Sequence, residues 1–443
     1  MIKKLGGISR VLPSTLKAPF IVREMIQSPR LKPIELRELQ NKKLSAIIKH
    51  SYDHVPYYHS LFKRAKIRPD DIRTIEDLNK IPTTEKNDLR HLPLEKVVAG
   101  NIDVTRCYRH TTSGTTGIPL FIYWTVDAKL VCDLQHLRWK SECGVRPVDR
   151  EVSIGVDYLL DPLKRLMGFA NGIHPSDDLH AQIKQIQRFK PKVLLAYPSC
   201  LKILAKEIKE RKVQGIDVKI LFTSGEMLDN YTRELLREVF DADVFDGYGI
   251  MEVGGICCEC VEHTGYHIWA ESVIVQIARG GESVSTGEEG EIVVTDLANY
   301  AMPFIRYKLD DSGVLIEDKS SCGSSLPLMK VTSGRNPNVT LLQGNVLIPS
   351  VNLVDFLNPI PGIKQFQVVQ EEIDHFRIKI VKNRRFGNST VKEIKQGLLA
   401  IIRRRINQKD LTMKIDVLTV DHIPRAKSGK FDYFITKIIP SPM

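Results

Sequence analysis

The sequence predicts an α/β fold in two parts. The large N-terminal domain, residues 1–335, combines parallel strands, helices and a β-rich subdomain, and a small mobile α+β domain covers residues 336–443. Three patterns predict this fold: strand-like and helical segments alternate in the middle of the chain, glycine-rich turns separate alternating strands after them, and a distinct set of strands with one helix ends the sequence. A chain of 443 residues also exceeds the size at which one hydrophobic core stops growing.

The first predicted helix begins near Pro33 and ends near His50. Proline suits the first turn of a helix, and the apolar side chains that follow recur at helical spacing. These side chains are Leu36, Leu39, Leu44, Ile47 and Ile48. Residues 55–86 read as short helices joined by turns. For residues 1–30 we expect an amphipathic arm that packs on the protein, with contact to a membrane surface as the alternative.

Strands and helices alternate between residues 192 and 245. Buried strands are predicted at 192–197, 219–223 and 244–245, with helices near 201–208 and 231–240. Alternation of this kind indicates parallel strands, and ligands bind at the carboxyl ends of such strands. Two segments fall there: Ser224-Gly225-Glu226, and Asp246 to Gly249 with Tyr248 between them.

The last third of the chain changes character twice. From Gly265 to about Ile316 alternating strands and glycine-rich turns predict the β-rich subdomain. A small α+β unit follows a boundary at 335–338. Its predicted elements are strands at 366–369 and 376–380, a helix through 394–402 and a strand at 415–420.

Composition excludes several classes of protein. The net charge is +11, but the basic residues are scattered and no aromatic-interleaved motif accompanies them, so we expect no nucleic-acid partner. No apolar run approaches the roughly 18 residues of a membrane-spanning helix. The eight cysteines are dispersed, unlike a disulfide scaffold. These features favour a cytoplasmic protein, with peripheral membrane contact as an alternative, and they leave a homodimer open.

The segment from His110 to Pro119 is the first candidate ligand site. Two glycines let the backbone approach a ligand closely, and its hydroxyl and N–H groups are typical of a phosphate cradle. The segment is no Walker A loop, because Ile118 stands where that motif has lysine. The positive charge for a nucleotide must therefore come from elsewhere in the chain. The alternative is an ordinary Ser/Thr/Gly surface turn.

Five stretches, in this order, decide between these alternatives. They are Thr112-Ser-Gly-Thr-Thr-Gly117, Tyr248-Gly-Ile-Met-Glu252, Pro303-Phe-Ile-Arg-Tyr-Lys-Leu-Asp-Asp311, Gly334-Arg335 and Pro424-Arg-Ala-Lys-Ser-Gly-Lys430. With them, the chain from about residue 35 onward resembles the ANL superfamily of adenylate-forming enzymes. The resemblance is greatest to the branch of phenylacetate-CoA ligases and capsular polysaccharide biosynthesis proteins.

The resemblance implies a ligase that uses ATP and Mg²⁺ to convert a small carboxylic acid, aromatic or otherwise cyclic, into its adenylate. Coenzyme A is the implied acceptor, and an amine is the alternative. The acid is expected between Trp124 and Phe169 and around Ser224. A third interpretation is a nucleotide-binding scaffold that has lost turnover.

The resemblance also implies a role for each matching residue. Thr112 and the loop after it would hold the β- and γ-phosphates, Glu252 would help to hold Mg²⁺, and Lys430 would bridge the carboxylate and the α-phosphate. The implied nucleotide-binding residues are Ser113, Gly114, Thr115, Thr116, Gly117, Ser224, Gly225, Glu226, Asp246, Tyr248, Gly249, Asp311 and Arg335. Among these, Tyr248 would lie against adenine, Asp311 would bind the ribose hydroxyls, and Arg335 would contact ribose or phosphate.

Four positions depart from the family pattern. Ile118 replaces a common lysine, Met251 a threonine, and Asp310 a glycine, while Pro337 occupies the usual hinge position. Proline fixes φ, so a domain rotation there would have to use ψ or neighbouring residues. These departures motivate the scaffold interpretation, and the intact Lys430 argues against it.

One cluster of cysteine and histidine has the spacing of a metal site. Cys260, His267 and Cys322 match a pattern in this branch that is compatible with structural zinc, which needs four ligands. The fourth ligand would have to come from Cys257, Cys258 or His263. Buried reduced thiols are the alternative interpretation.

Overall fold

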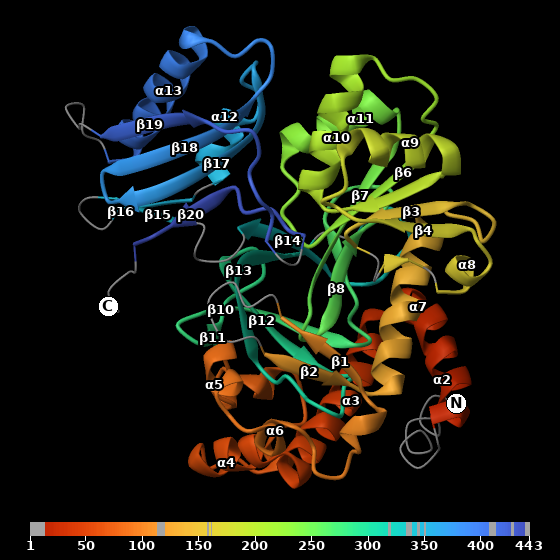
Figure 1. The fold of residues 1–443 in the computed structure, drawn as a ribbon. Coiled ribbons are helices and arrows are strands. Elements are labelled where there is room, and N and C mark those ends of the chain that lie inside the picture. Colours follow the sequence, from red (N-terminus) through yellow and green to blue (C-terminus); the bar gives the residue numbers. More distant parts are fainter. Residues whose placement is uncertain are drawn as a thin grey trace. The chain divides into compact units, whose positions relative to one another are not determined.

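The computed structural model describes residues 14–112, 120–156, 159–160, 162–317, 320–333, 339–342, 346–349, 351–406, 413–426 and 429–438 (Figure 1). The chain forms two compact units, each built from two segments. The first unit combines Met1–Val148 with Phe245–Thr332, and the second combines Asp149–Val244 with Ser333–Met443. Within the described ranges, every helix is too short or too polar to cross a lipid bilayer.

The first unit begins with helices that pack around an apolar core. The longer ones are α2 (Ser14–Gln27), α3 (Pro33–His54), α4 (Pro56–Arg64) and α7 (Val126–Glu142). As predicted, α3 begins at Pro33, and its N-terminus is capped because the Glu35 carboxylate accepts the Lys32 N–H over 2.9 Å. Its apolar face joins a buried cluster that includes Leu44, Ile47, Ile48, Tyr58, Phe62, Leu78, Leu297 and Ile305.

Short helices and turns connect these elements, as the sequence predicts for residues 55–86. They are η2 (Ser28–Arg30), η3 (Pro69–Asp71), η4 (Glu76–Lys80), α5 (Lys86–Arg90), α6 (Leu94–Val97) and η5 (Val104–Arg106). The expected N-terminal arm is helix α2, which packs on α7: Lys17 pairs with Asp127 over 3.0 Å, and Arg138 donates to the Met25 carbonyl over 2.7 Å.

The strands of the first unit form a largely antiparallel sheet. In hydrogen-bonded order they are β11 (Glu282–Ser283), β10 (Val273–Arg279), β12 (Glu289–Asp296), β13 (Tyr307–Ile316), β14 (Leu328–Ser333), β9 (Tyr266–Ile268), β8 (Gly254–Glu259) and β7 (Asp243–Ile250). This confirms the predicted β-rich subdomain. A separate hairpin pairs β1 (Tyr108–Thr111) with β2 (Phe121–Trp124).

The second unit begins with the predicted parallel sheet. Its order is β6 (Ile220–Ser224), β5 (Val193–Ala196), β3 (Glu151–Ile154) and β4 (Ala170–Ile173), and the β6–β5, β5–β3 and β3–β4 pairs are all parallel. The helices of this segment are α8 (Pro162–Leu166), α9 (Leu179–Phe189), α10 (Pro198–Arg211) and α11 (Asn230–Phe240). Figure 1 shows α10 and α11 side by side.

The C-terminal segment of the second unit has its own sheet and core. The sheet order is β19 (Lys414–Thr419), β18 (His375–Lys382), β17 (Ile363–Glu372) and β20 (Phe434–Thr436). The remaining elements are β15 (Val339–Leu342), β16 (Val346–Pro349), α12 (Val351–Leu357) and α13 (Asn388–Ile406). The helix α13 and sheet side chains share a buried cluster of Leu353, Leu357, Phe366, Phe376, Ile378, Ile394, Leu398 and Phe434. The predicted strands and helix are confirmed.

Helix α7 is the longest element that the sequence did not predict. It buries polar as well as apolar side chains, among them Gln135 and Lys140, so no regular apolar stripe marks it. Tertiary partners compensate for this: Gln135 donates to Ser272, and Trp139 donates from Nε1 to the Glu259 carbonyl over 2.9 Å. Burial of satisfied polar groups therefore hides this helix from a periodicity argument.

Candidate active site

The predicted phosphate loop is only partly described. Ser113, Gly114, Thr115, Thr116 and Gly117 lie outside the described residues, as do Arg335 and Pro337.

Thr112, the residue that opens the loop, is buried at the end of β1. Its backbone N–H donates to the Leu120 carbonyl over 3.1 Å, and its Oγ1 accepts the Leu120 N–H over 3.0 Å. The two ends of the loop are thus held together next to the β1–β2 hairpin.

Glu252 lies just beyond the end of β7 and is 3% exposed. Its Oε1 accepts a hydrogen bond from the Tyr307 hydroxyl over 3.2 Å and lies 4.0 Å from Nζ of Lys86. A buried carboxylate beside a cation suits a site for Mg²⁺ and phosphate, because Mg²⁺ takes one or two protein carboxylates and completes its shell with water and phosphate oxygens. Met251, the departure before it, is 40% exposed, so its side chain points away from this buried environment.

Lys86 is a candidate functional residue to which the sequence assigned no role. It begins helix α5, far from Glu252 along the chain, and only folding brings the two together. The resemblance of residues 80–86 to the family was the available signal, but a single lysine in a polar segment is ordinarily a solvated one.

Tyr248 and Asp311 lie together, as the resemblance requires of two residues that bind one nucleoside. The Tyr248 hydroxyl donates to Oδ2 of Asp311 over 2.5 Å, and Asp311 is 6% exposed. An ionised carboxylate in this position can accept hydrogen bonds from ribose hydroxyls.

The neighbouring Asp310 has a positive φ of 60°, in the left-handed region that glycine adopts most easily. The glycine that the family pattern implies at this position would suit this backbone geometry. Aspartate tolerates the left-handed region better than most residues, so the departure preserves the backbone conformation.

Asp246 and Gly249 have partners within the protein. Asp246 Oδ2 accepts from the Tyr266 hydroxyl over 2.8 Å, and its backbone N–H donates to Glu259 over 2.8 Å. Burial, followed by the charge of Asp246, raises the pKa of Tyr266 well above its usual value. At Gly249 an added Cβ would lie 2.4 Å from the Gly254 carbonyl oxygen, so only glycine fits between β7 and β8. Both contacts are structural, and no nucleotide is needed to account for either residue.

In the second unit, Ser224 is the last residue of β6, and Gly225 and Glu226 follow it at the carboxyl end of that strand. Ser224 is 8% exposed. Gly225 has φ of 81°, and a Cβ there would lie 2.9 Å from the Tyr197 ring and 3.3 Å from Cε of Lys430. The side chain of Lys430 therefore lies over Gly225, although the two residues are about 200 positions apart in the sequence. The Glu226 carboxylate contacts the same C-terminal loop, accepting the Phe431 N–H over 2.7 Å.

Cys260, His267 and Cys322 form the predicted metal-like cluster. Their ligand atoms all lie within 4.8 Å of one another, and Cys322 Sγ lies 3.2 Å from His267 Nε2. His267 Nδ1 lies 3.1 Å from the Leu326 carbonyl oxygen, and a hydrogen bond between these atoms leaves Nε2 as the nitrogen that can bind a metal. The residues present therefore fit a zinc ion on three sides.

The predicted fourth ligands do not join this cluster. Among the described residues it contains neither Cys257, Cys258 nor His263, whose ring instead stacks on Phe245 at 5.1 Å. Ser320 Oγ lies 3.6 Å from Cys260 Sγ. All eight cysteines are free thiols, as expected of a chain without a disulfide scaffold.

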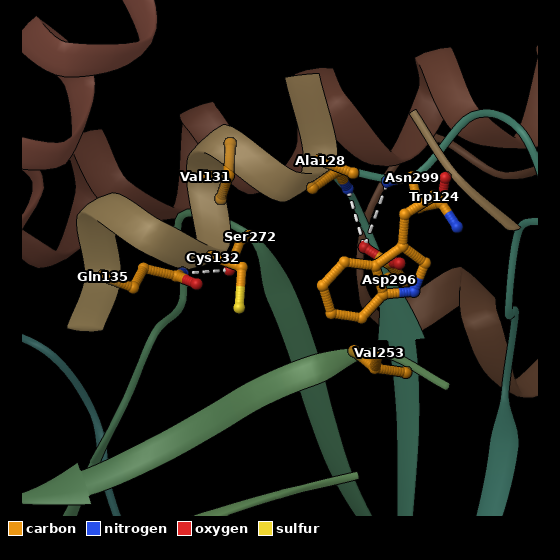
Figure 2. A pocket seen from close by; sticks show the side chains of 10 residues that line it. Trp124, Ala128, Val131, Cys132, Gln135, Val253, Ser272, Asp296 and Asn299 are labelled. Carbon is orange, nitrogen blue, oxygen red and sulfur yellow. Dashed lines mark hydrogen bonds between the residues drawn. The ribbon is translucent and has the colours of Figure 1, made fainter. Parts of the chain in front are cut away.

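A small cavity lies beside Trp124, between α7 and the sheet of the first unit (Figure 2). The Asp296 carboxylate, labelled in Figure 2, accepts the backbone N–H groups of Ala298 over 2.8 Å and Asn299 over 3.3 Å. Burial raises the pKa of Asp296 to about 7, although these two N–H donors lower it. Cys132 also lines the cavity, and burial raises its pKa to about 11, so its thiol stays protonated near neutral pH.

Comparison with known proteins gives two family matches. The family model "AMP-binding enzyme" matches residues 39–299, and the "CapK C-terminal domain" matches residues 343–437. The phenylacetate-coenzyme A ligase of Thermus thermophilus is 28% identical over 441 residues, which cover 92% of this chain and 98% of the relative. Protein CapK of Staphylococcus aureus is 22% identical and covers 82% of each chain.

Solved structures confirm the predicted fold class. A crystal structure of 2-hydroxyisobutyryl-CoA ligase in its postadenylation state superposes with a TM-score of 0.79 at 19% identity, covering 93% of this chain and 91% of that one. The family model for AMP-binding enzymes spans more than half of the 443 residues. The chain therefore belongs to the AMP-binding enzyme family and carries a CapK C-terminal domain, which confirms the resemblance seen in its sequence.

Proposed function

We propose that this protein is an ATP-dependent ligase that converts a small carboxylic acid into its acyl-adenylate and then transfers the acyl group to coenzyme A. Family membership supports the adenylation step, and the relatives named as phenylacetate-coenzyme A ligases support the acceptor. The observation that carries the proposal is the position of Lys430, whose side chain lies over Gly225 at the carboxyl end of β6.

In the first reaction a carboxylate oxygen of the acid attacks the α-phosphorus of ATP. A new P–O bond forms, the bond to the β-phosphate oxygen breaks, and pyrophosphate leaves. Negative charge accumulates on the oxygens around the α-phosphorus, and a fixed ammonium group there stabilises the transition state. We assign this role to Lys430.

The remaining residues bind and orient the substrates. Asp311 accepts hydrogen bonds from ribose, Tyr248 contacts the nucleoside, and residues 112–117 hold the β- and γ-phosphates. Glu252 would hold Mg²⁺, which would neutralise phosphate charge when bound, and Lys86 adds a second cation beside it. In the second reaction the thiol sulfur of coenzyme A attacks the acyl carbon, and AMP leaves with the electrons of the acyl–oxygen bond.

Exchange of labelled pyrophosphate into ATP, dependent on an added acid, tests the adenylation step. A panel of aromatic and other cyclic acids should contain at least one that supports exchange, and Lys430→Ala should lower the rate by about 100-fold or more, as expected for loss of a charge that stabilises a transition state. Lys209→Ala is the matched control, because Lys209 is exposed on α10 and pairs with the exposed Glu238. ATP binding without exchange on the whole panel would favour the scaffold interpretation.

An amine acceptor is the second candidate, the alternative that the resemblance of the sequence leaves open. In that reaction an amine nitrogen replaces the thiol sulfur and an amide forms. Supplying the acyl-adenylate with coenzyme A or with a panel of amino sugars and amino acids, and identifying the product by mass spectrometry, distinguishes the two.

Two further features belong to the proposal. We assign the C-terminal lid to residues 336–443, because residues 351–438 contain a sheet and a hydrophobic core of their own. We also propose that Cys260, His267 and Cys322 bind a structural zinc ion, because three soft or borderline ligands converge within bonding reach of one point.

A further inference from the structure

The Glu226 carboxylate, which follows β6, accepts hydrogen bonds from α10 and from the C-terminal loop that carries Lys430. Its Oε1 accepts the backbone N–H of Phe431 over 2.7 Å and the Ser199 hydroxyl over 3.1 Å. Its Oε2 accepts the Ser199 N–H over 3.0 Å. Three donors thus converge on one side chain, and one of them belongs to the residue directly after Lys430.

Arg425, on the N-terminal side of Lys430, is hydrogen-bonded to the same Ser199. Its Nη1 donates to the Ser199 hydroxyl over 2.7 Å and to the Gly429 carbonyl over 3.0 Å. Within the loop, the Ala426 N–H donates to the Lys430 carbonyl over 2.9 Å. The backbone on both sides of Lys430 is therefore anchored to the Glu226–Ser199 pair.

The anchored backbone determines where the lysine side chain lies. Gly225 and Gly429 both have positive φ, and a Cβ on either would meet the Tyr197 ring, at 2.9 Å and 3.4 Å respectively. The loop consequently approaches β6 closely enough for Cε of Lys430 to lie over Gly225. A side-chain substitution at either glycine would push the loop, and the ammonium group with it, away from the strand end.

These contacts differ from the role that the resemblance implied for Glu226, which was to bind the nucleotide. Burial raises the pKa of Glu226, while the Phe431 and Ser199 donors and the charge of Arg425 lower it. Every one of those donors comes from the protein itself, and both carboxylate oxygens are used by them. The side chain is thus accounted for by holding the loop rather than by holding a ligand.

We propose that Glu226 is a positioning residue for adenylation: its carboxylate, with Ser199, holds Arg425 and Phe431 and thereby places the ammonium group of Lys430. This inference rests on the proposed function, since it assumes that Lys430 acts in the first reaction. If the inference is right, Glu226 affects only the first reaction, because it contacts neither coenzyme A nor the acyl group.

The test compares Glu226→Gln with Glu238→Gln, an exposed glutamate on α11. Glutamine has nearly the same shape, but one oxygen becomes an NH₂ group that must face either the Ser199 or the Phe431 N–H donor. We expect Glu226→Gln to lower acid-dependent pyrophosphate exchange by about 10- to 100-fold while the KM for ATP changes by less than about 3-fold. The thiol-transfer reaction, started from separately prepared acyl-adenylate, should keep its wild-type rate.

A double variant separates positioning from a direct role. If Glu226 acts through Lys430, Glu226→Gln should cause less than about a 2-fold further loss in the Lys430→Ala background, because residues that act as a unit are not additive. A multiplicative loss in that background, or a raised KM for ATP with an unchanged turnover rate, would overturn the proposal in favour of contact with the nucleotide.

Limited proteolysis tests the docking of the loop even if no acid supports pyrophosphate exchange. Trypsin cleaves after Arg425 and Lys430, and docking protects these bonds. Glu226→Gln, and to a smaller extent Ser199→Ala, should raise the cleavage rate at these bonds by about 10-fold relative to Glu238→Gln, since an opened loop is cut in proportion to its open population. Unchanged cleavage would refute the docking role of Glu226, whereas absent exchange with accelerated cleavage would refute only the proposed enzymatic function.

Discussion

The Tyr248 hydroxyl donates a hydrogen bond to Oδ2 of Asp311 over 2.5 Å, joining the end of β7 to the middle of β13. This bond orients the carboxylate before any nucleotide arrives. We expect Asp311→Asn to weaken ATP binding by about 10- to 100-fold, the effect of losing one hydrogen bond to a charged acceptor. Isothermal titration with ATP measures the change.

Asp310→Asn is the matched control for that substitution. Asparagine tolerates the left-handed backbone at residue 310, so the control changes one carboxylate to an amide on the same strand without disturbing the backbone conformation. Equal losses of ATP affinity in the two variants would mean that the general charge of β13, and not ribose recognition by Asp311, governs binding.

The second prediction concerns the local stability that Lys202 provides. This buried lysine of α10 pairs with Asp229 over 3.4 Å and donates to Asn358 over 2.6 Å and to the Tyr433 hydroxyl over 3.2 Å. Its ammonium group also lies 4.5 Å from the centre of the Tyr433 ring. Lys202→Met should preserve the volume but remove these bonds.

Hydrogen exchange locates the effect of Lys202→Met. Protection in α10 and β17 should fall by about 10- to 100-fold, because removing one partner of a buried network is costly even when the volume is kept. Lys209→Met, on the exposed part of the same helix, should leave protection unchanged. Wild-type protection in the Lys202 variant would show that apolar packing alone holds these segments together.

The third prediction concerns the pH dependence of stability. The pKa of Asp296 is about 7 in the folded protein because of burial, against about 4 in an unfolded chain. The folded state therefore holds this proton more tightly, so ionisation of Asp296 reduces the free energy of unfolding as pH rises from about 4 to about 7. Above that range its effect is constant.

Asp296→Asn removes this pH dependence and keeps the oxygen that accepts the Ala298 and Asn299 N–H groups. The free energy of unfolding of the variant, relative to wild type, should rise by about 2 to 3 kcal/mol between pH 5 and pH 8. Urea unfolding followed by tryptophan fluorescence measures this, with the exposed Asp70→Asn as control. A difference that stays constant across this range would place the folded-state pKa near its ordinary value.

The fourth prediction concerns metal content. After dialysis against metal-free buffer the purified protein should retain about one zinc ion per chain, since structural zinc sites bind tightly. Cys260→Ser and Cys322→Ser should each lose the metal and lower the thermal unfolding temperature. Cys107→Ser, outside the cluster, should keep it. Equal zinc content in all variants, or none in the wild type, would support the reading of these residues as plain reduced thiols.

Local patterns were sufficient for much of the fold. The apolar runs of β5 and β6 read as strands because a parallel strand covered on both faces needs apolar side chains throughout, and all the residues of these two strands are buried. Helix α3 could be placed because Pro33 and the periodic leucines and isoleucines act within a few residues of each other. Helix α7 could not, since distant partners satisfy its buried polar side chains.

The candidate site also contains residues that the sequence singled out and contacts that only the folded structure reveals. The resemblance of short motifs to the ANL superfamily was enough to single out Glu252, Asp311, Lys430 and the Cys260, His267 and Cys322 cluster as candidates, because each motif lies within a few residues along the chain. Whether the phosphate loop at 113–117 and Arg335 take their implied places stays a prediction. The proximity of Lys86 to Glu252, and the use of Glu226 to hold the loop after Arg425, depended on the folded chain.

By itself, then, the sequence determined the fold class, the family and the kinds of group that the reaction needs, since these depend on short segments and on their order. Only the tertiary structure decided which groups meet: it placed Lys430 over Gly225, gave Glu226 the Phe431 N–H as a partner, and left His263 beside Phe245 instead of the cysteine cluster. The physical reason is that a hydrogen bond or an ion pair acts over about 3 to 4 Å in space. That distance depends on the packing of whole elements and cannot be read from separation along the chain.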